Sequence, residues 1–139
     1  MTDATHVTPR FKDSGARKGR HHDDAHLAAI RRLPCLVCRH HAPSEAAHIR
    51  LADLTYGVEH VGMAVKPHDW LTVPLCAAHH RTGKRAEHKV STARFWKLVG
   101  VNPIPIAKAL YEAPTHEAKM AILLRIYTFE AINDPNIDR

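Results

Sequence analysis

Two short pairs of metal-binding residue types, far apart in the chain, most constrain what this sequence can fold into. Cys35-x2-Cys38 and Cys76-x2-His79 each place two zinc-ligand side chains three residues apart. That spacing turns both members of a pair toward one side of a turn or helix. Three thiolates and one imidazole match the ligands of a structural zinc site. The sequence therefore predicts one zinc ion that joins the two pairs across the intervening segment.

The alternative is that the three cysteines are small buried apolar side chains. Composition favours the metal, because 139 residues with 45% hydrophobic but only 6% aromatic content predict one domain with a modest core. An odd number of cysteines, three, would leave one thiol over in a disulfide framework. Metal-bound thiolates suit a reducing compartment, so we expect a cytoplasmic location. We expect no membrane partner, since there is neither a long apolar stretch nor a secretory signal.

The chain is basic, with a formal net charge of +6, a pI of about 9.5 and 13 histidines. A polyanion is the expected partner, although many basic proteins have no nucleic-acid role. Residues 1–22 carry five basic and two acidic side chains, +3 in net, with few apolar residues. We expect a flexible arm there, either following phosphates or solvated without a partner, and one domain over residues 23–139.

The order of elements is predicted from caps and periodicity. Asp23 and Asp24 favour the start of a helix that Pro34 ends, and Asn102-Pro103 favours another helix start. Extended segments are expected at 45–51 and 70–75, around a loop at 52–68, with Pro74 at a sheet edge or at the end of its strand. Further helices are expected from Cys76 to about Gly83, over 91–99, over 102–111 and over 115–132. The last helix is predicted to bury Ala118, Ala121, Ile122, Ile126 and Phe129.

The motifs resemble those of the HNH, or ββα-metal, nucleases. Cys35-x2-Cys38 is followed by Ala47-His48-Ile49 and then by Leu75-Cys76-Ala77-Ala78-His79-His80, where His79 replaces the family's usual cysteine. Residues 33–111, with Lys66-Pro67-His68-Asp69-Trp70 and Phe95-Trp96, are similar to phage and prophage RecA-dependent nucleases of the Ref type. The resemblance implies an α+β fold, with a small zinc-stabilised ββα-metal core and flanking helices.

The resemblance also implies catalytic roles. His48 corresponds to the general base that takes a proton from water, and imidazole suits this because its ordinary pKa is about 6.5. His80 corresponds to a ligand of the catalytic metal, which is magnesium, manganese or zinc. Adjacent helical residues point about 100° apart, so His79 and His80 are expected to serve different ions. The plainer interpretation of His48 is a half-buried strand histidine with a satisfied hydrogen bond.

One expected catalytic ligand is missing, because Ala47 occupies the position where the family often has an acid. We expect Asp69 to supply the carboxylate instead and His88 to add a third ligand of the catalytic metal. The alternatives are a loop or capping carboxylate for Asp69 and an exposed helix-end histidine for His88. The middle Asn of the HNH pattern has no clear counterpart in this chain.

Four basic residues flank the expected centre and are candidates for holding phosphates: Arg50, Arg81, Lys84 and Arg85. They could equally form a solvated basic face. Taken with the resemblance, the sequence predicts a metal-dependent HNH endonuclease that cuts or nicks DNA in phage or prophage recombination, with a RecA filament as a candidate partner. The alternative is a zinc-stabilised DNA-binding or RecA-partner module without catalysis.

Overall fold

The computed structural model describes residues 20–58 and 66–133, with side chains as far as Thr128. Within these residues the chain forms a small α+β structure, with a two-stranded sheet and five α-helices, which confirms the predicted class. The elements in chain order are α1 (Asp24–Arg31), β1 (Glu45–His48), η3 (Leu54–Tyr56), β2 (Thr72–Leu75), η4 (Ala78–Thr82), α2 (Glu87–Val90), α3 (Thr92–Val99), α4 (Pro103–Glu112) and α5 (His116–Asn133).

The sheet is an antiparallel pair in which Glu45 lies opposite Leu75 and His48 lies opposite Thr72. Both strands are shorter than predicted, although the Ile49 N–H still donates to Leu71 O at 3.0 Å beyond the regular ladder. With two strands, each is an edge, so Pro74 is tolerated within β2. The Pro74 carbonyl accepts a hydrogen bond from Leu36 N–H at 2.9 Å, which ties the first cysteine segment to the sheet.

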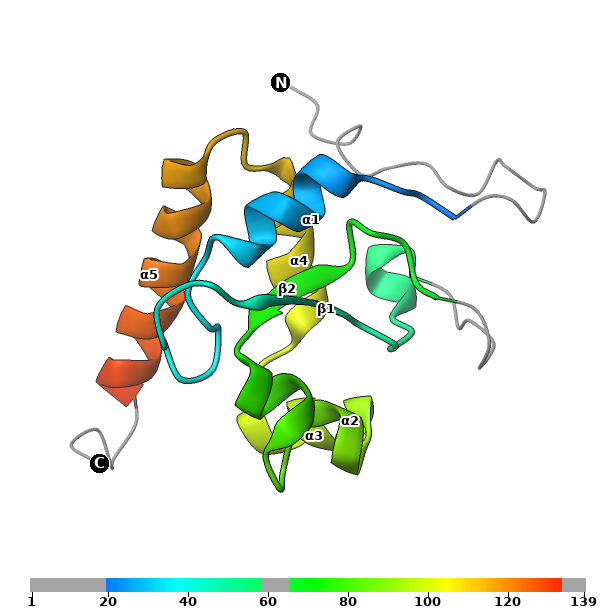
Figure 1. Ribbon diagram of the computed structural model, residues 1–139, viewed down its shortest axis with the longest axis vertical. Coiled ribbons are helices and arrows are strands. Elements are labelled where there is room, and N and C mark those ends of the chain that lie inside the picture. The colour runs from blue at the N-terminus through cyan, green and yellow to red at the C-terminus, as the bar shows by residue number, and fades with distance from the viewer. Residues whose placement is uncertain (1–19, 59–65, 134–139) are drawn as a thin grey trace.

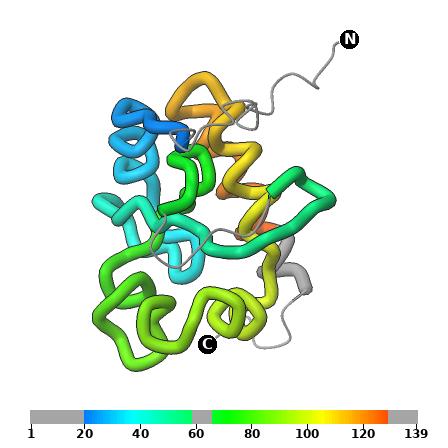
Figure 2. Tube along the Cα trace, turned by 90° about the vertical axis from the view of Figure 1, so that its right-hand side faces the viewer, coloured from blue at the N-terminus to red at the C-terminus, as the bar shows by residue number. Residues whose placement is uncertain are grey.

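Helices pack on both sides of this pair (Figure 1). α1 contacts β1 and β2, and α4 contacts β2 and α5. In Figure 1 and in the view turned by 90° (Figure 2), the stretch from η4 to α3 lies at the opposite end of the molecule from α1. The core that the helices form with the sheet is apolar and closed to water. It includes Ile30, Leu33, Val73, Leu75, Ile104, Leu110 and Leu123, each at most 1% exposed.

Side chains cap several of the helix starts, including those of α1, α3 and α4. Asp23 accepts from His26 N–H at 2.9 Å, and Asn102 accepts from Ile104 N–H at 3.1 Å, with Pro103 in the first turn of α4. Both caps confirm the predicted starts. Ser91 accepts from Arg94 N–H at 3.3 Å and begins α3, whose Phe95 and Trp96 are buried. None of the helices within the described ranges combines the length and apolarity needed to cross a membrane.

The predicted inner face of α5 is confirmed only in part: Ile122 and Ile126 pack against the core, but the fully buried positions lie about one residue further along the helix. The buried side chains of α5 are Lys119, Leu123 and Tyr127, which follow one another at intervals of four. Ala121 is exposed, and the side chain of Phe129 lies outside the described residues. Ala118, Ile122 and Ile126 are half-buried beside the inner line. Tyr127 matters for the site, because its hydroxyl donates to Cys35 O at 2.7 Å.

The helix predicted after Cys76 is a single π-helical turn, η4. Its signature is the hydrogen bond from Gly83 N–H to Ala78 O, five residues back, at 2.9 Å. A Cβ added at Gly83 would lie 2.6 Å from Ala78 O, so this close approach requires glycine. The short helix α2 that follows was not predicted, and it carries Glu87 and His88.

Candidate metal and histidine sites

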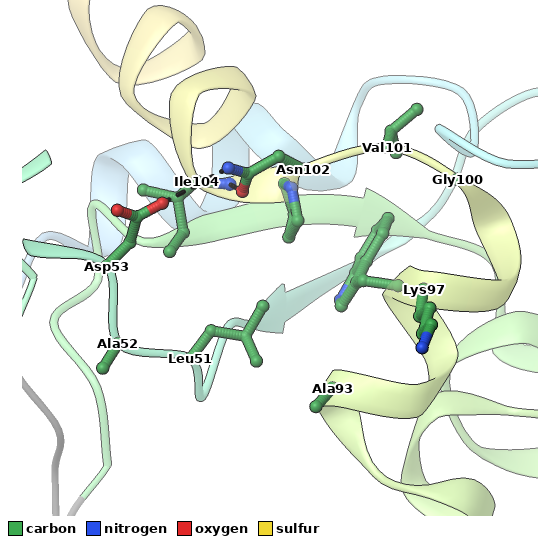
Figure 3. Close-up of a pocket in the computed structure, with 11 residues that line it drawn as sticks. Leu51, Ala52, Asp53, Ala93, Lys97, Gly100, Val101, Asn102 and Ile104 are labelled. Carbon is green, nitrogen blue, oxygen red and sulfur yellow. Dashed lines mark hydrogen bonds between the residues drawn. The ribbon is translucent and has the colours of Figure 1, made fainter. Parts of the chain in front are cut away.

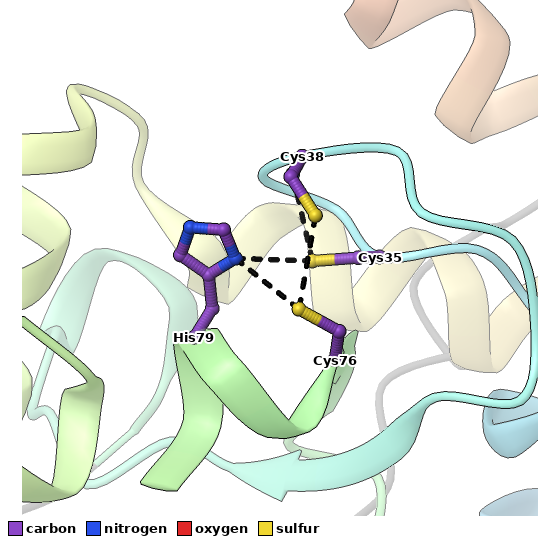
Figure 4. Close-up of side chains that lie close together, drawn as sticks. All are labelled: Cys35, Cys38, Cys76 and His79. Carbon is purple, nitrogen blue, oxygen red and sulfur yellow. Dashed lines mark hydrogen bonds between the residues drawn. The ribbon is translucent and has the colours of Figure 1, made fainter. Parts of the chain in front are cut away.

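The four residues of the two predicted pairs meet in space (Figure 4). Cys35, Cys38, Cys76 and His79 each offer one ligand atom, and these atoms all lie within 4.8 Å of one another. The four residues are called the cysteine group below. Cys35 is buried, Cys76 is half-buried and Cys38 is exposed. The predicted convergence of the two distant pairs is therefore confirmed, and the group could hold a metal ion such as zinc.

Local backbone contacts shape the first half of the cysteine group. Arg39 N–H donates to Cys35 O at 2.9 Å, and Cys35 N–H donates to His40 O at 2.9 Å, which closes a tight turn. Cys38 N–H lies 3.5 Å from Cys35 Sγ. The left-handed φ of +66° at Arg39 lets the chain reverse immediately after Cys38. The Arg39 guanidinium also stacks over the Tyr127 ring at 4.8 Å, so α5 supports this turn.

The spacing of the ligand atoms fits a tetrahedral ion. With zinc–sulfur bonds of about 2.3 Å, two sulfurs lie about 3.8 Å apart and a sulfur and nitrogen about 3.6 Å. Cys38 Sγ and Cys76 Sγ are 3.7 Å apart, and His79 Nδ1 is 3.3 Å from Cys76 Sγ and 3.9 Å from Cys35 Sγ. Burial raises the pKa of the Cys38 thiol to about 11, and the neighbouring sulfurs add to this. A bound cation would stabilise these thiolates together.

His80, adjacent to His79, belongs to a second group. His80, Glu87 and His88 offer ligand atoms within 4.8 Å of one another and are called the histidine group below. Glu87 is 3% exposed, and its Oε2 has no hydrogen-bond partner among the described residues. Burial raises the pKa of Glu87 above its ordinary value, although His80 and the nearby side chains of Trp96 and Thr92 oppose this. Two imidazoles and one carboxylate are the ligand set of many catalytic zinc sites, so this group too could hold a cation.

Glu45 orients His80 within the histidine group. The Nδ1 atom of His80 lies 2.7 Å from Glu45 Oε1, and its Nε2 lies 4.0 Å from Glu87 Oε1. Three hydrogen bonds from Arg81 and one from His80 lower the pKa of Glu45, so this carboxylate is ionised and accepts the Nδ1 proton. The Nε2 lone pair then faces Glu87. A carboxylate that fixes the outer nitrogen of a histidine is the usual outer-shell arrangement at metal sites.

Asp69 lies in neither group, which corrects its predicted place with His80 and His88. Its Oδ1 is 2.8 Å from His48 Nε2 and 2.7 Å from Arg20 Nη2, and its Oδ2 accepts from Asp23 N–H at 2.8 Å. Both oxygens of the carboxylate are therefore hydrogen-bonded near His48, at the opposite end of β1 from Glu45 and the histidine group. His48 and Asp69 are called the His48 pair below. Burial lowers the pKa of His48 and outweighs the opposing effect of Asp69, so this histidine is neutral at pH 7.

Part of the predicted arm packs against the His48 pair. Arg20 Nε donates to Pro67 O at 3.0 Å, and His21 N–H donates to His68 Nδ1 at 2.8 Å. Asp69 N–H in turn donates to His21 O at 3.0 Å. Arg20 and His21 thus belong to the folded domain, and the predicted boundary after residue 22 lies too late. Residues 1–19 of the arm lie outside the described residues.

The predicted phosphate-binding residues differ in their surroundings. Arg81 is ion-paired to Glu45 at 2.6 Å, which occupies its guanidinium in this structure. Lys84, Arg85 and Arg50 are exposed.

An open groove of about 420 Å³ lies elsewhere, between the loop after β1 and α3 (Figure 3). Its lining includes Leu51 and Lys97 but none of the predicted site residues, and Asn102 donates to Asp53 across it at 3.3 Å.

Sequence reasoning missed Glu45, Glu87 and Arg20 as members of these sites. The adjacency of Glu87 and His88 was a usable signal, since both follow His80 within eight residues. Glu45 lies three residues before His48 but serves His80. Arg20 was assigned to a flexible arm, and only its contacts with residues 67–69 reveal its place.

The comparisons with known proteins give a family without an assigned activity. Residues 15–98, more than half of the chain, match the family described as a protein of unknown function, DUF968, and the chain belongs to that family. No curated protein and no solved structure matched the chain in the same comparisons. The matched range contains the cysteine group, the histidine group and the His48 pair.

Proposed function

We propose that this protein is a metal-dependent endonuclease of the HNH type that cuts or nicks DNA. The observation that carries the proposal is the convergence of the cysteine group at the junction of β2 and η4, with His80 next in the chain. The order of two antiparallel strands and a helical turn supports a ββα-metal core. The basic charge of +6 supports a polyanionic substrate. Three further statements stay predictions: that the protein acts in phage or prophage recombination, that RecA is its partner, and that it lies in the cytoplasm.

The two groups would have different tasks. The cysteine group would hold a structural zinc ion that fixes η4 against the turn at Cys35. The histidine group would hold a catalytic divalent cation, either magnesium, manganese or zinc, which stabilises negative charge on the phosphate and on the leaving oxygen. His48, neutral at pH 7, would take the proton from the attacking water. The exposed Lys84 and Arg85 would hold flanking phosphates without reading bases.

The second candidate is a zinc-stabilised DNA-binding or RecA-partner module without catalysis, and a specific observation favours it. Glu45, which binds His80, and His48 are three residues apart in β1, or about 10 Å along the strand, and point to alternate faces. No hydrogen bond or ion pair between described residues joins the histidine group to the His48 pair. Ala47 also lacks the carboxylate that would bridge them.

A nicking assay separates the two candidates. The full chain would be incubated with supercoiled plasmid, linear duplex and single-stranded DNA, with each of Mg²⁺, Mn²⁺ and Zn²⁺, and with or without RecA. We expect metal-dependent nicking that His80→Ala and His48→Ala each reduce by at least ~100-fold. His41→Ala, at an exposed histidine, is the matched control and should nick at the parent's rate.

The metal content of each variant shows why it fails. His48→Ala should keep the zinc and the fold of the parent while losing activity. If His48→Ala nicks DNA as fast as the parent, the assigned base is wrong. If the parent binds DNA but nicks none of the substrates under any of these conditions, the module without catalysis is the better description.

A further inference from the structure

The contact between His48 and Asp69 is a partly buried hydrogen bond between a ring nitrogen and a carboxylate. His48 Nε2 lies 2.8 Å from Asp69 Oδ1, and Asp69 is 1% exposed. Burial raises the pKa of Asp69, but hydrogen bonds from His48 and from Asp23 N–H, and the Arg20 cation, outweigh it and lower the pKa. The carboxylate is therefore ionised, and it can only accept hydrogen bonds from its partners.

The surrounding chain holds Asp69 in one orientation. Arg20 Nη2 donates to the same Oδ1 at 2.7 Å, and Asp23 N–H donates to Oδ2 at 2.8 Å. The Asp69 backbone N–H is bound to His21 O at 3.0 Å, and Thr72 Oγ1 donates to Asp69 O at 3.0 Å. Both carboxylate oxygens and both backbone groups are thus used. A carboxylate fixed at this many points can fix the ring that it binds.

We propose that Asp69 is the positioning residue of His48, keeping the ring proton on Nε2 and leaving Nδ1 as the basic nitrogen. In that tautomer Nδ1 carries the ring's lone pair, and none of the residues that the structure describes donates a hydrogen bond to it. When Nδ1 takes a proton from water, the ring becomes a cation beside the ionised Asp69, which stabilises it. The catalytic part of this inference rests on the proposed nuclease function, whereas the position of the proton does not.

Other charges bear on His48 besides Asp69. Lys66, in the segment before β2, and Arg20, before α1, both disfavour a positive charge on the ring. His21 and His68 lie beside Asp69, joined by the hydrogen bond from His21 N–H to His68 Nδ1. Removing the negative charge of Asp69 therefore leaves His48 facing cations alone, and the ring should bind a proton less readily. This direction is specific to a carboxylate that stabilises the protonated base.

The proton is located directly by nitrogen-15 NMR of the histidine rings, in the full-length zinc-loaded protein at neutral pH. We expect the His48 ring to carry its proton on Nε2, and Asp69→Asn to lower the population of that form. His48→Gln assigns the signals. If the His48 ring of the parent carries its proton on Nδ1, the inference is overturned whether or not the chain cuts DNA.

Kinetics test the catalytic part separately. Asp69→Asn should lower kcat for nicking at least ~10-fold, with KM within twofold, and should move the acid limb of the kcat/KM profile to lower pH. Glu112→Gln, which removes an exposed carboxylate paired with Lys108, is the control and should change neither. An Asp69→Asn profile with an unmoved acid limb would overturn the positioning role. A parent with the Nε2 proton but no nicking would overturn the proposed function and leave the assigned proton position standing.

Discussion

The cysteine group and the histidine group share a backbone junction, because His79 and His80 are neighbours, yet their chemistry differs. The cysteine group offers three sulfurs and one nitrogen at spacings that fit a closed tetrahedral ion. The histidine group offers two nitrogens and a buried carboxylate, with an oxygen that no described residue binds. The first set suits a structural ion and the second suits an ion with open positions. The π-helical turn η4 therefore carries one candidate ligand of each group.

The largest effect should come from breaking the cysteine group. Cys76→Ser removes the ligand that follows β2, and we expect the free energy of unfolding to fall by more than ~4 kcal/mol, because structural zinc binding stabilises the folded state directly. Urea unfolding followed by circular dichroism, with zinc present, measures this. His40→Ala, which changes an exposed ring beside the group, is the control. A Cys76→Ser variant as stable as the parent would show that the cysteine group does not stabilise the fold.

The histidine group should respond to substitution without loss of the fold. Glu87→Gln keeps the shape of a buried side chain but removes its charge, so we expect Mn²⁺ to bind at least ~10-fold more weakly. The metal-free stability should be unchanged or higher, because an unpaired buried oxygen no longer needs to be charged. Calorimetric titration with Mn²⁺ and thermal unfolding measure the two effects. Equal Mn²⁺ affinity in the parent and the variant would exclude Glu87 as a ligand.

A buried histidine away from both groups should contribute its own loss of stability in acid. His26 is 7% exposed, and burial, followed by the Lys119 cation, lowers its pKa to about 4. Because the unfolded ring binds protons more readily, with an ordinary pKa of 6.5, the folded state loses stability as pH falls from 6.5 toward 4. The slope is at most about 1.4 kcal/mol per pH unit, reduced by solvent screening.

His26→Gln tests that contribution. The variant should lose less stability than the parent between pH 7 and pH 5, measured by urea unfolding at constant zinc concentration. His41→Gln, at an exposed histidine, should follow the parent. If His26→Gln has the parent's pH slope, the loss in acid comes from other groups instead, such as the metal ligands and His48, whose pKa burial also lowers.

The smallest expected effect concerns the support of the cysteine turn by α5. Tyr127→Phe removes the hydroxyl that donates to Cys35 O at 2.7 Å, and we expect a loss of about 1 kcal/mol in unfolding free energy. Tyr56→Phe, on η3, is the control. Urea unfolding of both variants decides this, and Mn²⁺ binding at the histidine group should stay as in the parent. An unchanged unfolding free energy in Tyr127→Phe would mean that the turn needs no support from α5.

Local signals in the sequence predicted the parts that depend on short spacings. The two ligand pairs, the Asp23 cap and the Asn102-Pro103 start are all readable within four residues, and all are confirmed. The inner face of α5 was not readable, because apolar residues at positions such as Met120, Leu123 and Leu124 surround much of the helix. Which side chains of α5 are buried is then determined by packing against the rest of the protein.

Long-range contacts account for what the sequence did not predict. Glu87 lies on a helix of four residues, too short for a periodic pattern. Asp69 was assigned to a metal from the resemblance, because this chain has Ala47 where the family often has an acid. No sequence pattern shows that Arg20 and Asp23, more than 40 residues earlier, bind its oxygens. The same limit hid the partnership of Glu45 with His80, which depends on how η4 folds back onto β1.

Metal stoichiometry by native mass spectrometry tests the assignment of two different ions most directly. The full chain purified without added metal should carry one zinc ion, and excess Mn²⁺ should add one further ion. Cys76→Ser should lose the zinc, whereas Glu87→Gln should keep it and lose the added Mn²⁺. A parent chain that carries no zinc, or a Cys76→Ser variant that retains it, would contradict the joining of the two distant pairs by one ion.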